Sequence, residues 1–301
     1  MERLNQFKNF LKSHGKSDAT CEAYISDTKR FMEYCAQCKL AILNLNADHI
    51  SEFVFNRQEH GKTNSARRAL LGIRQYYRFL ATIEKNIFNP TDDVVIPNRI
   101  EHRRSSVDHI VFENLMAAAG QQISSLKSSR DQALLCLLGM EGIKASELIE
   151  LTWSQLVMSG AEGSLRIKGQ RPRTITLNSE TITHLRLYRS IFQANGDYVS
   201  TGNMFIAFKG KHSSVHLTSL TRHGVKFTLY ELGDHCKIQK LNSEELRSFA
   251  IRSQFQSGKT LDQVMAHLGL RTAGQLAAYY MLNNPLDYSK MPETSSTVSK
   301  H

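Results

Sequence analysis

The stretch from Leu241 to Met281 constrains the fold most, because its apolar residues recur at helical spacing and cap-forming residues and glycines divide it. This pattern predicts three short helices joined by tight turns. The first helix carries Arg247, and the third carries Tyr279 and Tyr280. We therefore expect the turns to bring a guanidinium and a tyrosine hydroxyl together. The predicted helix starts are Ser243, Thr260 and Thr272, and the predicted stops are Gly258 and Gly269.

The length of 301 residues predicts two domains, and 41% apolar residues suffice for ordinary cores. Without a long apolar run or a signal-peptide core, the chain is expected to be cytoplasmic and not to enter a membrane. Five cysteines at scattered positions argue against a disulfide framework. Cys35 and Cys38 form a CxxC pair with no second Cys or His pair close by, so no metal or other cofactor is expected.

A formal net charge of +10 and an isoelectric point near 9.4 indicate an anionic polymer as partner. A membrane surface would also attract this charge, but no strongly basic amphipathic helix with a bulky aromatic face stands out. Nucleic acid is therefore the favoured partner.

Residues 1–97 follow a helical pattern throughout. One predicted helix carries Arg67, Arg74 and Arg78 on a single stripe, seven and four residues apart. A stripe of charge is often a solvated face, but no acidic residue falls between positions 62 and 81. The stripe is therefore interpreted as a phosphate-facing surface.

Pro90 and Pro97 break this pattern, and the sequence NRIEHRRSS that follows is polar, basic and without periodicity. Its Arg103 and Arg104 are expected to follow a DNA backbone, although a flexible solvated linker has nearly the same signature. The expected organisation is a helical bundle at 1–97, a basic linker at 98–105, a second domain at 106–290 and a polar tail at 291–301.

The second domain is predicted to be mixed but mostly helical. Residues 131–140, with the run ALLCLLGM, should form a central buried helix. Alternating runs at 165–168 and 174–177 predict a β-hairpin whose tip carries Arg171 and Arg173. A short strand is expected at 205–208 and a helix at 217–232. The fold class is thus mainly α (α+β), a helical N-terminal bundle plus a mostly helical domain with a small β-sheet.

The order of these elements, and the sequences GIKASEL, IKGQRPRTITL, EELRSFA and HLGLRTAGQLAAYY within them, resemble the tyrosine recombinases, especially the bacterial Xer-like and phage integrase-like members. The resemblance covers nearly the whole chain. It implies a core-binding domain at 1–97 and a catalytic-type domain at 106–290 that close around double-stranded DNA. It also implies chemistry without a metal.

The family motifs read GxRxSEL, GKGxKxR, HxLR and LGH, the last followed nine residues later by tyrosine. By this resemblance, Lys168 matches the hairpin lysine, Arg247 the arginine of HxLR, and Tyr279 the nucleophile. Three positions depart from the pattern. They are Lys144 for the first arginine, Glu244 for the histidine of HxLR, and Leu270 for the histidine of LGH.

Attack on a DNA phosphodiester builds charge on the phosphoryl oxygens, which fixed cations must stabilise. The resemblance implies that Tyr279 forms a 3′-phosphotyrosyl link while Lys168 protonates the leaving 5′-oxygen. Arg247 and Lys144 would stabilise the charge. Lysine keeps the charge of an arginine but loses its planar fork, which predicts a slow enzyme. Glu244 would repel a phosphate unless it is protonated or turned towards a cation, and it would accept a proton from Tyr279 at that cost.

Each of these residues also has a structural interpretation. Tyr279 and Tyr280 at helical spacing are typical of core or rim aromatics, and Arg247 on an apolar helix is typical of an ion-pair partner. Leu270 can pack but cannot donate a hydrogen bond. His267 lies one helical turn earlier, and its plainer interpretation is a helix-end histidine rather than a substitute donor.

The resulting hypothesis is a DNA-binding tyrosine recombinase-like protein that acts in site-specific recombination or integration, self-associates on DNA and works with recombination or transposition partner proteins. The alternative is a catalytically impaired or inactive sequence-specific DNA binder that marks a site or recruits the machinery of a mobile element. A related relaxing or hydrolytic activity is a third alternative. The candidate catalytic residues are Tyr279, Arg247, Lys168, Lys144 and Glu244, and the candidate DNA-binding residues are Arg67, Arg74, Arg78, Arg103, Arg104, Arg171 and Arg173.

Overall fold

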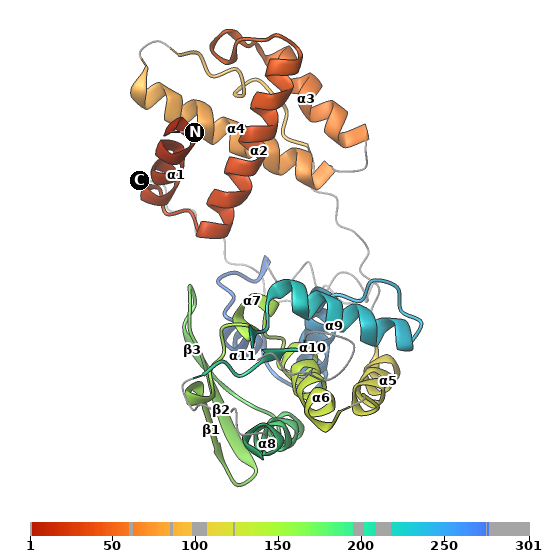
Figure 1. The fold of residues 1–301 in the computed structure, drawn as a ribbon. Helices are drawn as coiled ribbons and strands as arrows, with labels where there is room; N and C mark the ends of the chain where they lie inside the picture. The colour runs from red at the N-terminus through yellow and green to blue at the C-terminus, as the bar shows by residue number, and fades with distance from the viewer. Residues whose placement is uncertain are drawn as a thin grey trace. The chain divides into compact units, whose positions relative to one another are not determined.

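The computed structural model of the protein describes residues 2–59, 63–84, 87–97, 107–122, 124–194, 202–208, 218–274 and 276. The chain divides into two compact units, Met1–His102 and Arg103–His301, each with its own hydrophobic core (Figure 1). Most of the described residues are helical and the sheets are small, which confirms the predicted mainly α class.

The first unit is a helical bundle, whose described elements are α1 (Glu2–Ser13), α2 (Asp18–Gln37), η1 (Ile42–Asn44), α3 (Ala47–Glu59) and α4 (Thr63–Ile83). The predicted apolar face of α4, which includes Leu70, Ile73 and Tyr77, is buried, and this helix packs on α2 and α3. Ser17 caps α2, accepting a hydrogen bond from the amide of Thr20 at 3.3 Å.

The second unit surrounds one buried helix with further helices and a small sheet. Its described helical elements are α5 (His109–Gly120), α6 (Ser125–Gly139), α7 (Ala145–Leu148), η2 (Trp153–Gln155), α8 (Ser179–Ala194), α9 (Arg222–His235), α10 (Ser243–Gln256) and α11 (Leu261–Leu268). α6 contacts α5, α8 and α10 and buries most of its residues, because its C-terminal run from Ala133 to Leu138 is apolar on all faces. The central helix predicted for residues 131–140 is confirmed.

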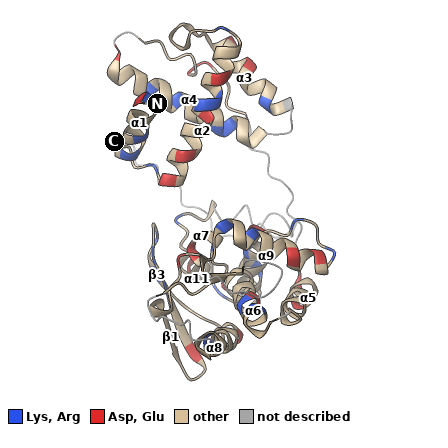
Figure 2. Cartoon of the chain, in the orientation of Figure 1, with Lys and Arg blue, Asp and Glu red and all other residues tan. Residues whose placement is uncertain are grey.

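The sheet is antiparallel with the order β1–β2–β3, formed by β1 (Leu156–Ser159), β2 (Glu162–Ile167) and β3 (Arg173–Thr176). Leu165 pairs with Ile175, and both side chains are buried. Helix α8 contacts the sheet at β2 (Figure 1). The predicted hairpin is confirmed, and β1 is an additional strand. Figure 2 shows basic residues at the tip of this hairpin.

Two details of the prediction are wrong. Thr218–Ser219 form the strand β5, which pairs with β4 (Ile206–Ala207), so the helix expected at 217–232 begins only at Arg222. Asn242, rather than Ser243, caps α10, because the Asn242 side-chain oxygen accepts hydrogen bonds from the backbone amides of Glu244 and Glu245. Thr260 and Gly269 cap α11 at its two ends as predicted.

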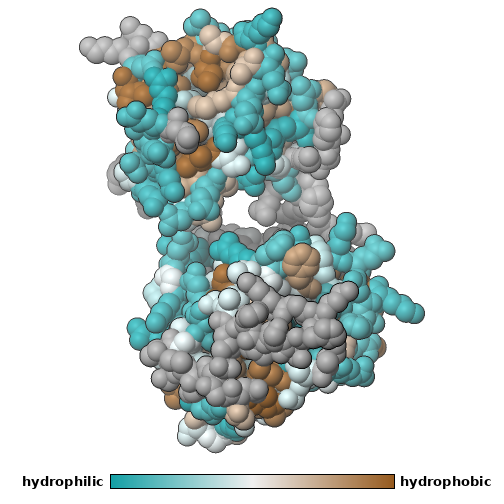
Figure 3. All heavy atoms as spheres, viewed as in Figure 1, coloured by the Kyte–Doolittle hydropathy of each residue, from teal (hydrophilic) through white to brown (hydrophobic). Residues whose placement is uncertain are grey.

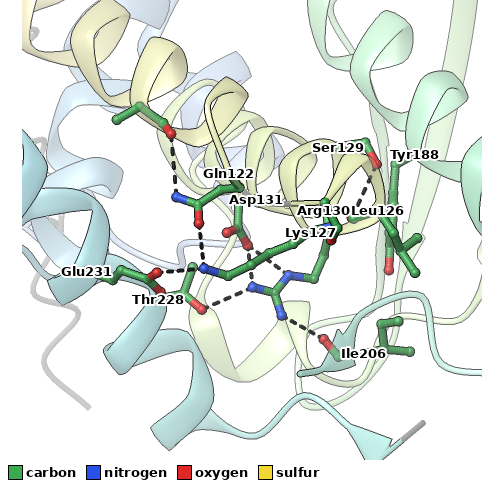
Figure 4. A network of polar contacts seen from close by, with 12 residues as sticks. Gln122, Leu126, Lys127, Ser129, Arg130, Asp131, Tyr188, Ile206, Thr228 and Glu231 are labelled. Atoms are coloured by element: carbon green, nitrogen blue, oxygen red, sulfur yellow. Dashed lines mark hydrogen bonds and ion pairs between the residues drawn. The ribbon is translucent and has the colours of Figure 1, made fainter. Parts of the chain in front are cut away.

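A buried polar network joins α6 to β4 and α9 (Figure 4). Arg130 donates from Nε to Asp131 Oδ1 at 2.8 Å and from Nη1 to the Ile206 carbonyl at 3.0 Å. Burial raises the pKa of the Asp131 carboxyl, and the charge of Arg130 opposes this rise. Lys127 Nζ lies 2.6 Å from a carboxylate oxygen of Glu231 on α9. These contacts stabilise the second unit around α6.

Among the described helices, none is long and apolar enough to cross a membrane. Figure 3 shows hydrophilic residues over most of the surface that faces the viewer, with apolar residues in separate patches.

Candidate functional site

The carboxyl end of α11 is the point where several predicted site residues meet. The carbonyls of Met265 and Ala266 accept hydrogen bonds from the amides of Leu270 and Gly269, at 2.9 and 3.2 Å. Gly269 has φ +66°, which glycine adopts without strain, and it ends the helix. The last carbonyls of a helix have no hydrogen-bond donor within the helix. The carbonyl oxygens that follow, those of residues 267 to 269, can therefore accept hydrogen bonds from side chains.

Three arginines donate to three successive carbonyls at this helix end. The carbonyl oxygen of residue 267 accepts from Arg173 Nε at 2.7 Å, that of residue 268 from Arg247 Nη2 at 3.2 Å, and that of residue 269 from Arg171 Nη1. These arginines come from β3, α10 and the β2–β3 turn. The negative end of the helix dipole favours cations, which explains how three like charges gather here.

Arg173 and Glu147 form a two-point ion pair beside the same helix end. Arg173 Nη1 lies 2.8 Å from one carboxylate oxygen, and Nη2 lies 3.1 Å from the other. Burial by itself would raise the pKa of the Glu147 carboxyl. The hydrogen bonds and charge of Arg173, with the Lys144 amide and the charge of Arg247, outweigh burial and lower this pKa. The pair therefore joins β3 to α7.

Arg247 holds the turn before α7 against α11. It is 2% exposed, and its Nη1 donates to the Gly142 carbonyl while its Nη2 reaches that of Leu268. Gly142 has φ +68°, and a Cβ there would lie 2.8 Å from Leu268 Cδ2. A side chain at this position would have to move the Leu268 side chain, and the positive φ itself favours glycine. The planar fork of an arginine suits the two-carbonyl contact.

Lys144 lies at the N-terminal end of α7, next to these arginines. Burial lowers the pKa of its ammonium group, and the charges of Arg247, Arg171 and Arg173 lower it further, while Glu147 opposes them. We call Lys144, Arg171, Arg173 and Arg247 the cationic cluster. An anion bound among them would be stabilised by donors that the fold already holds in place.

Glu244 and Leu270, the other two departures from the family motifs, have structural explanations. Leu270 packs against Ile251 and Val264 in the small core between α10 and α11. Glu244 lies in the first turn of α10, where the positive end of the helix dipole favours a carboxylate. Its amide donates to Asn242 Oδ1 at 3.1 Å.

His267 pairs with Glu141 of the turn before α7. Its Nε2 lies 3.2 Å from Glu141 Oε2 and 3.1 Å from the Glu141 carbonyl oxygen, and both side chains are nearly buried. The other carboxylate oxygen of Glu141 accepts a hydrogen bond from the amide of Asn178 at 2.9 Å. This geometry supports a structural role for His267.

Lys168 follows β2 and is exposed at the start of the hairpin turn. Tyr279, Tyr280, Arg103 and Arg104 lie outside the described residues, so the roles predicted for them stay predictions.

The predicted arginine stripe on α4 is divided between internal contacts and exposed charge. Arg74 Nη2 donates to the Thr91 carbonyl at 2.5 Å, and Arg67 Nη1 donates to the Pro97 carbonyl at 2.8 Å. These bonds fasten residues 91–97 to α4. Arg78 is exposed. The phosphate contacts predicted for this stripe stay predictions, with Arg78 as its most accessible member.

Sequence reasoning did not single out Glu147 or a cluster around Asp27 in the first unit. Glu147 belongs to the GIKASEL sequence, so the motif itself was an available signal. The partners of Asp27 are Arg30, Arg57 and Arg68, which come from three helices. Residue spacing along one helix carries no signal for such a set.

Two protein-family models match the chain. "Phage integrase, N-terminal SAM-like domain" matches residues 4–83, and "Phage integrase family" matches residues 105–284. A helical bundle followed by a mostly helical unit with a cationic centre fits this class. The chain belongs to the phage integrase family of tyrosine recombinases. The resemblance drawn from the motifs is confirmed.

Named relatives and solved structures align with this chain over most of its length. The tyrosine recombinase XerD of Halalkalibacterium halodurans is 26% identical over 276 residues, which are 88% of this chain and 88% of the relative. XerD of Shewanella oneidensis is 26% identical over 218 residues, or 71% and 70% of the two chains. A lambda integrase dimer described as bound to a COC′ core site has a TM-score of 0.71 at 15% identity, covering 97% of this chain and 98% of that one. This last likeness shows the fold.

Proposed function

We propose that the protein binds duplex DNA and catalyses site-specific strand exchange by the tyrosine recombinase reaction. The observation that carries this proposal is the cationic cluster, in which side chains from separate segments gather at the end of α11. Preorganised cations suit a phosphate that gains charge during reaction. Membership of the phage integrase family and the DNA-bound lambda integrase support the same function.

In the proposed reaction, the hydroxyl oxygen of Tyr279 attacks phosphorus and the bond from phosphorus to the 5′-oxygen breaks. The tyrosine proton passes to solvent or to Glu244, and Lys168 donates a proton to the leaving 5′-oxygen. The product is a 3′-phosphotyrosyl link and a free 5′-hydroxyl. Attack by a different 5′-hydroxyl reverses these steps and rejoins the strands without ATP.

We place the reacting phosphate beside Lys144 and Arg247. A phosphate there would relieve the repulsion that the neighbouring arginines exert on the Lys144 ammonium. The guanidinium of Arg247 would offer donors oriented by its contacts with two carbonyls. The hairpin that carries Lys168 also carries Arg171, so closure of this hairpin on DNA would complete the site.

A second candidate function is DNA binding without strand cleavage. Two observations favour it: Leu270 packs against an apolar core, and both terminal nitrogens of Arg247 already donate to carbonyls. The loss of one preorganised donor costs about a hundred- to a thousandfold in rate. Such a protein would mark a site or recruit the machinery of a mobile element.

We further infer that the protein self-associates on DNA, since the lambda integrase structure is described as a dimer on its core site. Recombination or transposition partner proteins and a cytoplasmic location belong to the same proposal. Strand exchange between two sites requires more than one protomer, because each protomer supplies one tyrosine.

The two functions are separated by trapping the covalent intermediate. Duplexes selected from a random library by binding to the protein are given single nicks at successive positions, so that the short fragment released by cleavage diffuses away. We expect a denaturant-resistant protein–DNA adduct with the wild type and with Tyr280→Phe, and none with Tyr279→Phe. Salt-sensitive binding without an adduct for any nick would reject strand exchange and support the second function.

A further inference from the structure

A buried carboxylate in the first unit holds three arginines that come from three helices. Asp27 on α2 is fully buried. Arg68 on α4 contacts both of its oxygens, with Nε 2.7 Å from Oδ2 and Nη2 3.3 Å from Oδ1. Arg57 on α3 and Arg30 on α2 lie 3.6 and 3.8 Å from Oδ1. Three positive charges thus surround one negative charge.

The arginines are accessible, but the carboxylate is not. The side chains of Arg30 and Arg68 are 55% and 47% exposed, whereas that of Asp27 is 0% exposed. An anion that approaches this surface therefore meets guanidinium groups while the carboxylate stays beneath them. Figure 2 shows Lys and Arg positions on the helices that contribute these residues.

Arg57 lies deeper and links the set to α4. Its side chain is 17% exposed, and its Nη2 donates to Ser65 Oγ at 2.8 Å. Burial lowers the pKa of the Arg57 guanidinium, and the charges of Arg30 and Arg68 lower it further, while Asp27 opposes them. The group would therefore gain stability from another negative charge.

A purely structural ion pair needs one cation for each carboxylate, and Arg68 alone provides it with two hydrogen bonds. The remaining two arginines are surplus to that role. The guanidinium fork binds two oxygens of a phosphate in parallel and keeps its charge at every relevant pH. Arg67 and Arg74, by contrast, donate to backbone carbonyls of their own unit.

We propose that Arg30 and Arg68 bind backbone phosphate of duplex DNA, with Asp27 and Arg57 as the residues that position them. This inference rests on the DNA binding proposed above and adds a phosphate contact of the first unit. The site comes from α2, α3 and α4 together, so it forms only when these helices are packed. Neutralisation of the surplus charge by phosphate releases counterions from DNA.

The test is the salt dependence of DNA affinity, measured by fluorescence anisotropy on a duplex selected for wild-type binding. The variant Arg30→Ala/Arg68→Ala is expected to reduce the slope of log affinity against log salt by about two, since each lost phosphate contact removes about 0.9. The matched control is Lys12→Ala/Lys16→Ala, which removes two positive charges from exposed residues of the same unit. We expect its slope to stay close to that of the wild type.

Arg30→Ala alone keeps the test valid where the double variant loses stability, because Arg30 is the most exposed and the farthest from Asp27. Its slope is expected to fall by about one. An unchanged slope in a folded Arg30→Ala variant would overturn the inference. An equal fall in the lysine control would also overturn it, because net charge alone would then explain the effect. A wild-type protein that binds no duplex would instead reject the proposed function and this inference with it.

Discussion

Glu147 is the residue on which the geometry of the cationic cluster depends most. It accepts two hydrogen bonds from Arg173 and a third, at 3.1 Å, from the amide of Lys144. One carboxylate thereby fixes the hairpin strand β3 and the turn before α7. Arginine is required at 173, because a lysine would not reach both oxygens and the carbonyl of residue 267 at once.

The lowered pKa of Glu147 predicts how stability depends on pH. The folded-state pKa lies below the unfolded value of about 4.3, so the ion pair stabilises the protein above that pH. This contribution is lost as the pH falls through the folded-state pKa. We expect Glu147→Gln to lower the free energy of unfolding by about 2 kcal/mol at neutral pH and by less in acid. Urea unfolding at several pH values measures both.

Glu150→Gln is the control for this prediction, because Glu150 is exposed on the same segment. It should leave both the stability and its pH dependence close to those of the wild type. The same loss of acid sensitivity in both variants would contradict the role assigned to Glu147.

At the scale of elements, α4 fastens the segment that leaves the first unit. Arg74 donates to the carbonyls of Thr91 and Val94, and Arg67 donates to that of Pro97. Thr91 is fully buried, so its carbonyl contact lies inside the unit. Helix α4 therefore fixes where the chain departs towards residues 98–105.

Two substitutions on α4 should affect different properties, one the stability of the fold and the other DNA binding. Arg74→Ala leaves carbonyls of residues 91 and 94 without this donor, so we expect a loss of about 1–3 kcal/mol and faster amide exchange across residues 91–97. Arg78→Ala, at an exposed position, should keep the stability and lower the salt slope of DNA binding by about one. Hydrogen exchange checks the prediction for Arg74→Ala, and DNA affinity measured at several salt concentrations checks the prediction for Arg78→Ala. Equal losses of stability in the two variants would contradict the assignment of Arg74 to internal contacts and of Arg78 to the exposed surface.

At the scale of the whole molecule, the two units have separate hydrophobic clusters. That of the first unit includes Phe7, Phe31 and Leu70, and that of the second includes Leu134, Trp153 and Leu246. Each cluster closes within its own unit, so each unit has the core that independent folding requires. We retain the proposed boundaries, with a first domain at 1–97, a linker at 98–105 and a second domain at 106–290.

Limited trypsin digestion tests these boundaries, because the proposed linker contains Arg99, Arg103 and Arg104. We expect early cleavage there and two fragments that each retain helical circular dichroism and a cooperative thermal transition. Mass spectrometry identifies the ends of the fragments. Early cleavage within α2 or α6, or fragments that lose their structure, would contradict this organisation.

Much of the fold follows from residue spacing. The buried face of α4 and the β2–β3 hairpin are predictable because burial on one side needs a repeat of 3.6 or 2 residues. The buried helix α6 is predictable because its run ALLCLLGM is apolar on every face. Helix α8 buries Ile182, Leu185 and Tyr188 at the same helical spacing, so the signal for it was present although no helix was predicted there. The strand β5 has only two residues, which is too few to show a period.

The four residues of the cationic cluster could be named from the sequence, but their contacts could not. Motif resemblance named Lys144 and Arg247, and the predicted hairpin tip named Arg171 and Arg173; the structure brings these four to one helix end. The acceptors of the three arginines at this helix end are backbone carbonyls. Because every residue has a backbone carbonyl, no sequence pattern indicates which carbonyls accept these hydrogen bonds. The partners of Arg74 are also backbone carbonyls, so the sequence did not indicate them either.

The carbonyls at the end of α11 also bear on how this chain can change over generations. Substitution replaces side chains, but it leaves the peptide oxygens of residues 267 and 268 in place. A substitution can therefore remove a side-chain donor in this stretch while the arginines keep their anchors. Substitutions among the side chains here would therefore change which donors face a bound anion well before they change the architecture.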